Sequence, residues 1–250
     1  MRFQLIAART AFAALLLAAL TGVGAVAGVR LGQLSDHIGR LVMIPATILG
    51  LLALALSLGW LRSALSRNAG EGKRIGLIAL IGSIAFLYWP LTYVYYGYKA
   101  LPINAATTDP EDPPRFVTLA SPGNRTFNAG RKLAYKGEQV TVGYALREEY
   151  PTLTHPHAGL LVSPQKAFWR CYEAVKKLGW TIVDANEKDL RIEATDKSLW
   201  FGRISDIVIR VRPAGSMGSR VDARSQSRED EPDHGRNAAR LKAFFGVFKF

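Results

Sequence analysis

The chain has 250 residues, of which 49% are hydrophobic and 21% charged, and a formal net charge of +12. This length is enough for about two domains. Residues 1–98 hold only eight bases and two acids, so the two parts of the chain differ sharply in polarity. A basic chain is typical of proteins that bind nucleic acid or anionic lipid. The sequence has no uninterrupted basic stripe with aromatic residues, which argues against nucleic acid.

Three apolar runs lie at about residues 5–29, 41–61 and 75–98. Each has the roughly 20 residues that span a bilayer, where only a helix satisfies its own backbone hydrogen bonds. A cleaved signal peptide is the alternative for the first run, but its length and the two later runs favour a retained helix. No Asp, Glu, Lys or Arg lies deep in a run, which favours an anchor over a transport path. Residues 1–100 are therefore predicted to be a three-helix transmembrane anchor in the lipid bilayer.

The bases that flank the runs predict the orientation of this anchor. One side would carry six bases: Arg2, Arg9, Arg62, Arg67, Lys73 and Arg74. The other side would carry three: Arg30, Arg40 and Lys99. Because bases gather on the cytoplasmic side, the N-terminus is expected inside. The C-terminal domain is then expected on the periplasmic side of a bacterial inner (cytoplasmic) membrane.

Residues 101–160 contain seven prolines together with Asn, Thr and Gly. Such a composition predicts an extended, weakly structured linker, with a short helix at about 140–149. His155-Pro156-His157 pairs two histidines without an evident third ligand, so a solvated turn is favoured over a metal site. No metal or cofactor is predicted.

From Ser163 the pattern becomes regular and predicts a folded domain over residues 161–250. A helix is expected at 164–178, with Ser163 as its cap and Pro164 in its first turn. Four strands follow at about 180–184, 190–195, 205–212 and 220–227, and then a helix at 233–248. Alternation in the strands gives one apolar and one charged face. The predicted fold is a transmembrane anchor followed by a small α-β-β-β-β-α domain of the α+β class, with a four-stranded antiparallel sheet.

Polar residues concentrate where the last strand meets the last helix. The candidate residues are Asp206, Asp222, Arg224, Ser225, Ser227, Arg228, Asp233, Asn237 and Arg240. They are interpreted either as a structural network or as a site in which Arg224, Arg228 and Arg240 bind a carboxylate or phosphate. A hydrolase is a third reading, but no nucleophile-elbow motif surrounds the serines. No catalytic residue is assigned.

The loop Trp200-Phe201-Gly202 joins two of the expected strands and carries two adjacent aromatic residues. Two roles are open for it: insertion into the membrane interface, or cover for the edge of the core, which is the favoured one.

Several segments resemble the DUF1499 family. They are residues 191–196, Trp200-Phe201-Gly202, residues 206–211, Arg-Ser-x-Ser-Arg at 224–228 and Asp-x-Gly-x-Asn-x-x-Arg at 233–240. The resemblance covers about residues 160–250 and looks like a bacterial membrane-anchored member. The family usually has Arg-Val-Gly after Ser-x-Ser, whereas here Arg228 precedes Glu229-Asp230-Glu231. The resemblance implies no established reaction.

These patterns favour a membrane-anchored envelope protein whose domain is a non-enzymatic binding or interaction module. Its expected partner is a membrane or periplasmic protein. The alternative is a domain that binds a small anionic ligand or lipid, or a hydrolase, through the Arg/Ser/Asp cluster.

Overall fold

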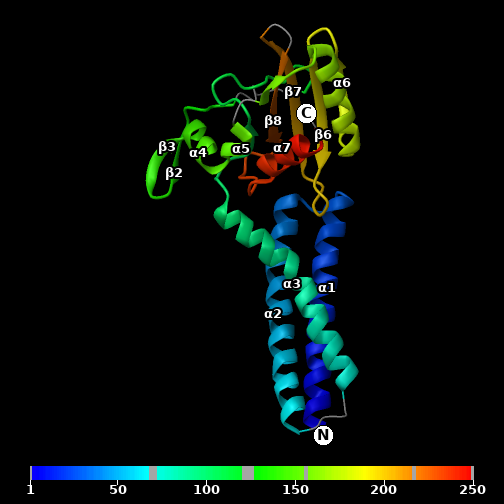
Figure 1. The fold of residues 1–250 in the computed structure, drawn as a ribbon. Coiled ribbons are helices and arrows are strands. Elements are labelled where there is room, and N and C mark those ends of the chain that lie inside the picture. The colour runs from blue at the N-terminus through cyan, green and yellow to red at the C-terminus, as the bar shows by residue number, and fades with distance from the viewer. Residues whose placement is uncertain (1, 68–71, 120–126, 155–156, 216–217, 249–250) are drawn as a thin grey trace. The chain divides into compact units, whose positions relative to one another are not determined.

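The computed structural model describes residues 2–67, 72–119, 127–154, 157–215 and 218–248 (Figure 1). The chain divides into two compact units. The first contains Met1–Tyr95 together with Leu199–Gly202, and the second contains Tyr96–Ser198 and Arg203–Phe250.

The first unit is built from three long helices: α1 (Arg2–Arg30), α2 (Asp36–Arg67) and α3 (Lys73–Lys99). All three are long and apolar enough to span a membrane, which confirms the prediction from the apolar runs. Buried hydroxyls are satisfied locally, since Ser57 and Ser83 donate to carbonyls one turn earlier. A Cβ at Gly76 would collide with the indole ring of Trp60, so glycine allows these two helices to approach closely.

Among the described residues, the second unit contains one antiparallel sheet of six strands. These are β1 (Ala105–Thr107), β4 (His157–Leu160), β5 (Thr181–Asn186), β6 (Arg191–Lys197), β7 (Ile204–Ala214) and β8 (Gly218–Ser227). The order is β1-β8-β7-β6-β5, and β4 pairs with the other end of β8. The last four strands match those predicted from alternation, so the α+β class is confirmed.

The hydrophobic core lies on one face of this sheet, called here the inner face, beneath α6 (Pro164–Lys177) and α7 (Arg236–Val247) (Figure 1). Phe168 and Cys171 of α6 pack with Ile207 and Ile209 of β7 in this core. The helix begins as predicted: the Ser163 hydroxyl accepts a hydrogen bond from the Lys166 N–H at 3.3 Å. The apolar residues on the helical stripe and on the inner face of the strands therefore pack into one buried layer.

The region expected to be a linker differs most from its prediction. It contains β1, the hairpin β2 (Lys132–Tyr135) and β3 (Glu138–Thr141), the helices α4 (Val142–Glu149) and α5 (Pro151–Thr154), and β4. The sheet is therefore larger than the four strands expected. Both added strands have three or four residues, too few to show a period of two in the sequence. The helix expected at about 140–149 is present as α4.

Candidate functional site

Five of the predicted polar residues form a network on the inner face, called here the inner-face network: Ser225, Ser227, Asp233, Asn237 and Arg240. Asn237 is at its centre and fully buried. Its Oδ1 accepts hydrogen bonds from Ser225 at 2.7 Å and from Arg240 at 2.9 Å. Its Nδ2 donates to the Asn104 carbonyl at 2.7 Å and to Ser227 at 3.1 Å. The network thus ties α7 to β8 and to the backbone just before β1.

Asp233 fixes the start of α7. Its carboxylate accepts hydrogen bonds from the backbone N–H groups of Gly235 at 2.9 Å and Asn237 at 2.7 Å. Gly235 has φ of 77°, a left-handed conformation that glycine adopts without strain. Burial raises the pKa of Asp233 above its usual value, although both N–H groups oppose that rise.

The other four predicted residues, Asp206, Asp222, Arg224 and Arg228, lie on the opposite face, called here the outer face. This face is covered by residues 108–119, which the sequence assigned to the linker. The buried Asp222 carboxylate accepts hydrogen bonds from Arg212 at 2.6 Å, Arg220 at 2.8 Å and Arg210 at 3.3 Å. The same arginines also bind two aspartates of the covering segment, Asp109 and Asp112.

Ion pairs on this face shift the pKa of groups that form them, in the direction that favours the charged state. Slight burial opposes the shift, but the charges of Arg210 and Arg212 lower the pKa of Asp112. At the other end of the sheet, a two-pronged hydrogen bond to Asp206 raises the pKa of the Arg228 guanidinium. The outer face is therefore held to the covering segment by ionised groups.

Arg224 has a different environment from the other arginines of the outer face. Only 2% of its surface is exposed, and its guanidinium lies over the rings of Phe116 and Phe127, 5.2 and 5.9 Å from their centroids. It also hydrogen-bonds Gln226 and the Pro114 carbonyl. A ligand would have to displace the covering segment to reach it.

Glu193 of β6 is a buried residue of this face that is not among the predicted polar residues. It is fully buried, and its carboxylate accepts the backbone N–H groups of residues 117, 118 and 119 at 2.6, 3.2 and 2.7 Å. Arg191 Nε lies 3.0 Å away. A charged residue in an alternating strand is usually solvated, so this role was not predictable from the alternation.

The predicted cluster is thus divided by the sheet. Arg224 and Arg228 lie on the outer face and Arg240 on the inner face, where its Nε donates to Asp196 at 2.8 Å. That these three arginines bind one anion together stays a prediction. Their positions on opposite faces of the sheet do not favour it. The Ser225 hydroxyl is buried and donates to Asn237, so it is not arranged as a hydrolase nucleophile.

The aromatic loop belongs to the first unit. Within that unit the Trp200 ring lies 4.8 Å and the Phe201 ring 5.8 Å from the Trp89 ring, centroid to centroid. Gly202 has φ of 65° and reverses the chain after Phe201. Cover for the edge of the core and insertion into a membrane interface both stay predictions for this loop.

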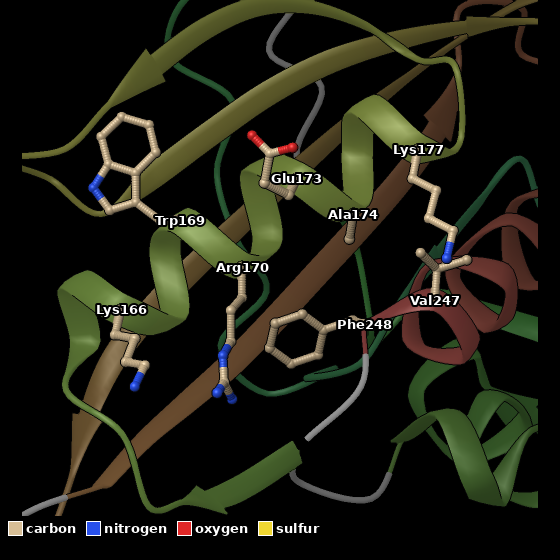
Figure 2. A pocket seen from close by; sticks show the side chains of 8 residues that line it. All are labelled: Lys166, Trp169, Arg170, Glu173, Ala174, Lys177, Val247 and Phe248. Atoms are coloured by element: carbon tan, nitrogen blue, oxygen red, sulfur yellow. The ribbon is translucent and has the colours of Figure 1, made fainter.

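A groove of about 550 Å³ that the sequence did not predict lies along α6 (Figure 2). Its lining residues are Lys166, Trp169, Arg170, Glu173, Ala174, Lys177, Val247 and Phe248. Figure 2 shows Arg170 beside the ring of Phe248, and Lys177 beside Val247. The Phe248 ring stacks on Phe244 at 5.6 Å and is only 2% exposed, so it anchors the groove floor to the core.

Charge in the groove is strongly one-sided. Lys166, Arg170, Ala174 and Lys177 recur at intervals of four, four and three residues, so they form one stripe of α6. None of the three bases forms an ion pair within the described parts of the chain. Glu173 lies on the same helix face and also lines the groove, and its carboxylate is 3.4 Å from Lys176. The groove therefore presents three cations without an ion-pair partner and one carboxylate beside an apolar floor.

Among the residues that the structure describes, no group of three or more His, Cys, Asp or Glu is placed to hold a metal ion. Of the motif His155-Pro156-His157, the first two residues lie outside the described residues.

The three spans and the six-stranded domain define a membrane protein with an α+β domain. Residues 105–248 match the sequence profile of the family described as Protein of unknown function (DUF1499), and the chain belongs to this family. The match extends back into residues 105–160, the segment predicted to be a linker. No curated protein matches the chain.

Proposed function

We propose that the chain is a membrane-anchored, non-enzymatic binding module that holds an anionic group in the groove along α6. The observation that carries the proposal is the stripe of Lys166, Arg170 and Lys177, which lack ion-pair partners in the described structure. Elsewhere in the domain the prominent arginines are engaged by carboxylates or aromatic rings. Three cations without an ion-pair partner outnumber the one lining carboxylate, Glu173, around this concave surface, and such an excess of positive charge favours a ligand of negative charge.

The inner-face and outer-face networks have a structural role in this proposal. Their groups satisfy one another within the protein, and the buried ones are inaccessible to a ligand unless the fold opens. The groove has the opposite character, because it is concave, open and basic. The proposed binding site in the groove is therefore distinct from the polar cluster predicted from the sequence.

The proposed location is the bacterial inner membrane, with the binding domain on the periplasmic side. The six-to-three distribution of bases around the spans supports this orientation. Alkaline phosphatase fused to the C-terminus is expected to be active, and a fusion in the segment between α2 and α3 is expected to be inactive. The reverse pattern of activities would place the domain in the cytoplasm.

Ligand binding in the groove is expected to stabilise the second unit against heat. The full chain in nanodiscs of neutral lipid is mixed with a panel of carboxylates, phosphates and their alkyl derivatives. A ligand at about 100 times its Kd adds about 2.7 kcal/mol. In a unit of this size, that stabilisation raises Tm by roughly 5–10 °C.

Two variants with the same net charge make this measurement specific. Lys166→Gln/Arg170→Gln/Lys177→Gln is expected to lose the rise in Tm. Lys132→Gln/Lys136→Gln/Lys188→Gln removes three exposed bases from outside the groove and is expected to keep it. Equal responses of the two variants, or no rise with any compound, would contradict a binding role for the groove.

A further inference from the structure

We infer that the groove binds an anionic amphiphile, whose charged head lies at Lys166 and Arg170 and whose hydrocarbon chain lies over Ala174, Val247 and Phe248. This inference rests on the proposed function and names the chemical class of its ligand. The class follows from how charge and apolar surface are distributed along α6.

The cations do not form a compact cluster. Lys166 and Arg170 are one helical turn apart, whereas Lys177 lies 11 residues beyond Lys166, or roughly 16 Å along the helix at about 1.5 Å per residue. A compact ion such as phosphate therefore reaches only one end of the stripe. The groove beyond Arg170 is then left for another part of the ligand.

The surface between the two ends is apolar. Ala174 is the stripe residue between Arg170 and Lys177, and Val247 and Phe248 approach it from the end of α7 (Figure 2). Trp169 adds an indole ring that is 48% exposed at the rim, with its Nε1 donating to Glu187 at 3.1 Å. A charged head on Arg170 thus adjoins a path on which a hydrocarbon chain is removed from water.

The rest of the chain provides a source for such a ligand. Three helices are suited to span a membrane, so the domain is tethered where acyl chains and acidic lipid heads are concentrated. Both a phosphatidylglycerol of the bilayer and a free alkyl phosphate or fatty acid carry the required head and chain. The shared chemistry is an anionic head with a single accessible hydrocarbon chain.

The test is a chain-length series of alkyl phosphates from ethyl to octyl, with inorganic phosphate as the compound without a chain. Binding to the full chain in phosphatidylcholine nanodiscs is measured by equilibrium dialysis. The value for the variant Lys166→Gln/Arg170→Gln/Lys177→Gln is subtracted, so that partition into the disc cancels. Affinity is expected to rise about two- to fourfold per methylene, because full burial of a methylene gives a factor of roughly four.

A second arm identifies the source of the amphiphile. Replacing a fifth of the phosphatidylcholine by phosphatidylglycerol is expected to lower octyl phosphate binding severalfold where bilayer lipid occupies the groove. Unchanged binding identifies a free amphiphile as the ligand. Both outcomes agree with an anionic head and a hydrocarbon chain.

Other outcomes overturn the inference. One such outcome is that phosphate and octyl phosphate bind with equal affinity, and both lose binding in Lys166→Gln/Arg170→Gln/Lys177→Gln. This result would keep the groove as an anion-binding site but reject an amphiphile as its ligand. Tight binding of poly-glutamate with no dependence on alkyl chain length would identify an acidic protein segment instead. Loss of all anion binding would reject the proposed function itself, so the two failures are distinguishable.

Discussion

Replacing Glu193 with alanine is expected to lower the free energy of unfolding of the second unit by about 3–5 kcal/mol. The buried carboxylate accepts three backbone N–H groups of residues 117–119 and lies 3.0 Å from Arg191 Nε. Alanine leaves those donors without an acceptor under the covering segment, and a buried unsatisfied donor costs about 1–3 kcal/mol. The covering segment is expected to detach first.

The single cysteine of the chain makes this change measurable without unfolding the membrane helices. Cys171 is fully buried, and burial raises the pKa of its thiol. It is therefore expected to react with thiol reagents only when the second unit opens. Labelling in a urea series gives the unfolding midpoint for this unit alone.

A matched control for Glu193 is Glu138→Ala, at an exposed position of β3. It is expected to change the free energy of unfolding by no more than about 0.5 kcal/mol. If Glu193→Ala unfolded at the same urea concentration as this control, residues 117–119 would not be held by the sheet. The covering of the outer face by residues 108–119 would then be contradicted.

The sequence was sufficient for those elements whose periodicity is long enough to recognise. The apolar runs of the first unit, α6, and strands β5 to β8 all repeat over many residues. Their predicted bounds agree with the structure to within a few residues. Fold class followed from these elements because the apolar face of a sheet and the apolar stripes of helices bury one another as packed layers.

The outer face was not predictable in the same way. Arg224 and Glu193 alternate with apolar residues, a pattern that strands with a solvated face share. What covers them is a proline-rich segment about 75 residues or more earlier than the acids and bases it contacts, and it has no period of its own. Long-range pairing between such segments leaves no local signal in one sequence.

One part of the groove was predictable from the sequence. The bases at 166, 170 and 177 lie on one helical stripe, and that spacing was available in the sequence. The apolar residues that predict α6, Phe168 and Cys171, lie on the opposite, buried side of the helix, so they do not indicate the groove. The contribution of Val247 and Phe248 from α7 required the fold.

Replacing Asn237 with alanine is the change expected to separate the structural reading of the inner-face network from the functional one. It removes the acceptor of Ser225 and Arg240 and the donor to Asn104 and Ser227. The expected loss is about 2–4 kcal/mol, because several buried polar groups lose their partner at once. Cys171 labelling in urea measures it, and Gln165→Ala, at an exposed position of α6, is the control.

The decisive comparison is between stability and ligand response in the same variant. Asn237 does not line the groove, so folded Asn237→Ala protein is expected to keep the full rise in Tm with an anionic ligand, from a lower starting Tm. If the inner-face network were the binding site, this variant would lose the rise and Lys166→Gln/Arg170→Gln/Lys177→Gln would keep it. The two variants therefore give opposite results under the two readings, because the network fixes α7 from beneath while the cations of α6 line a surface open to solvent.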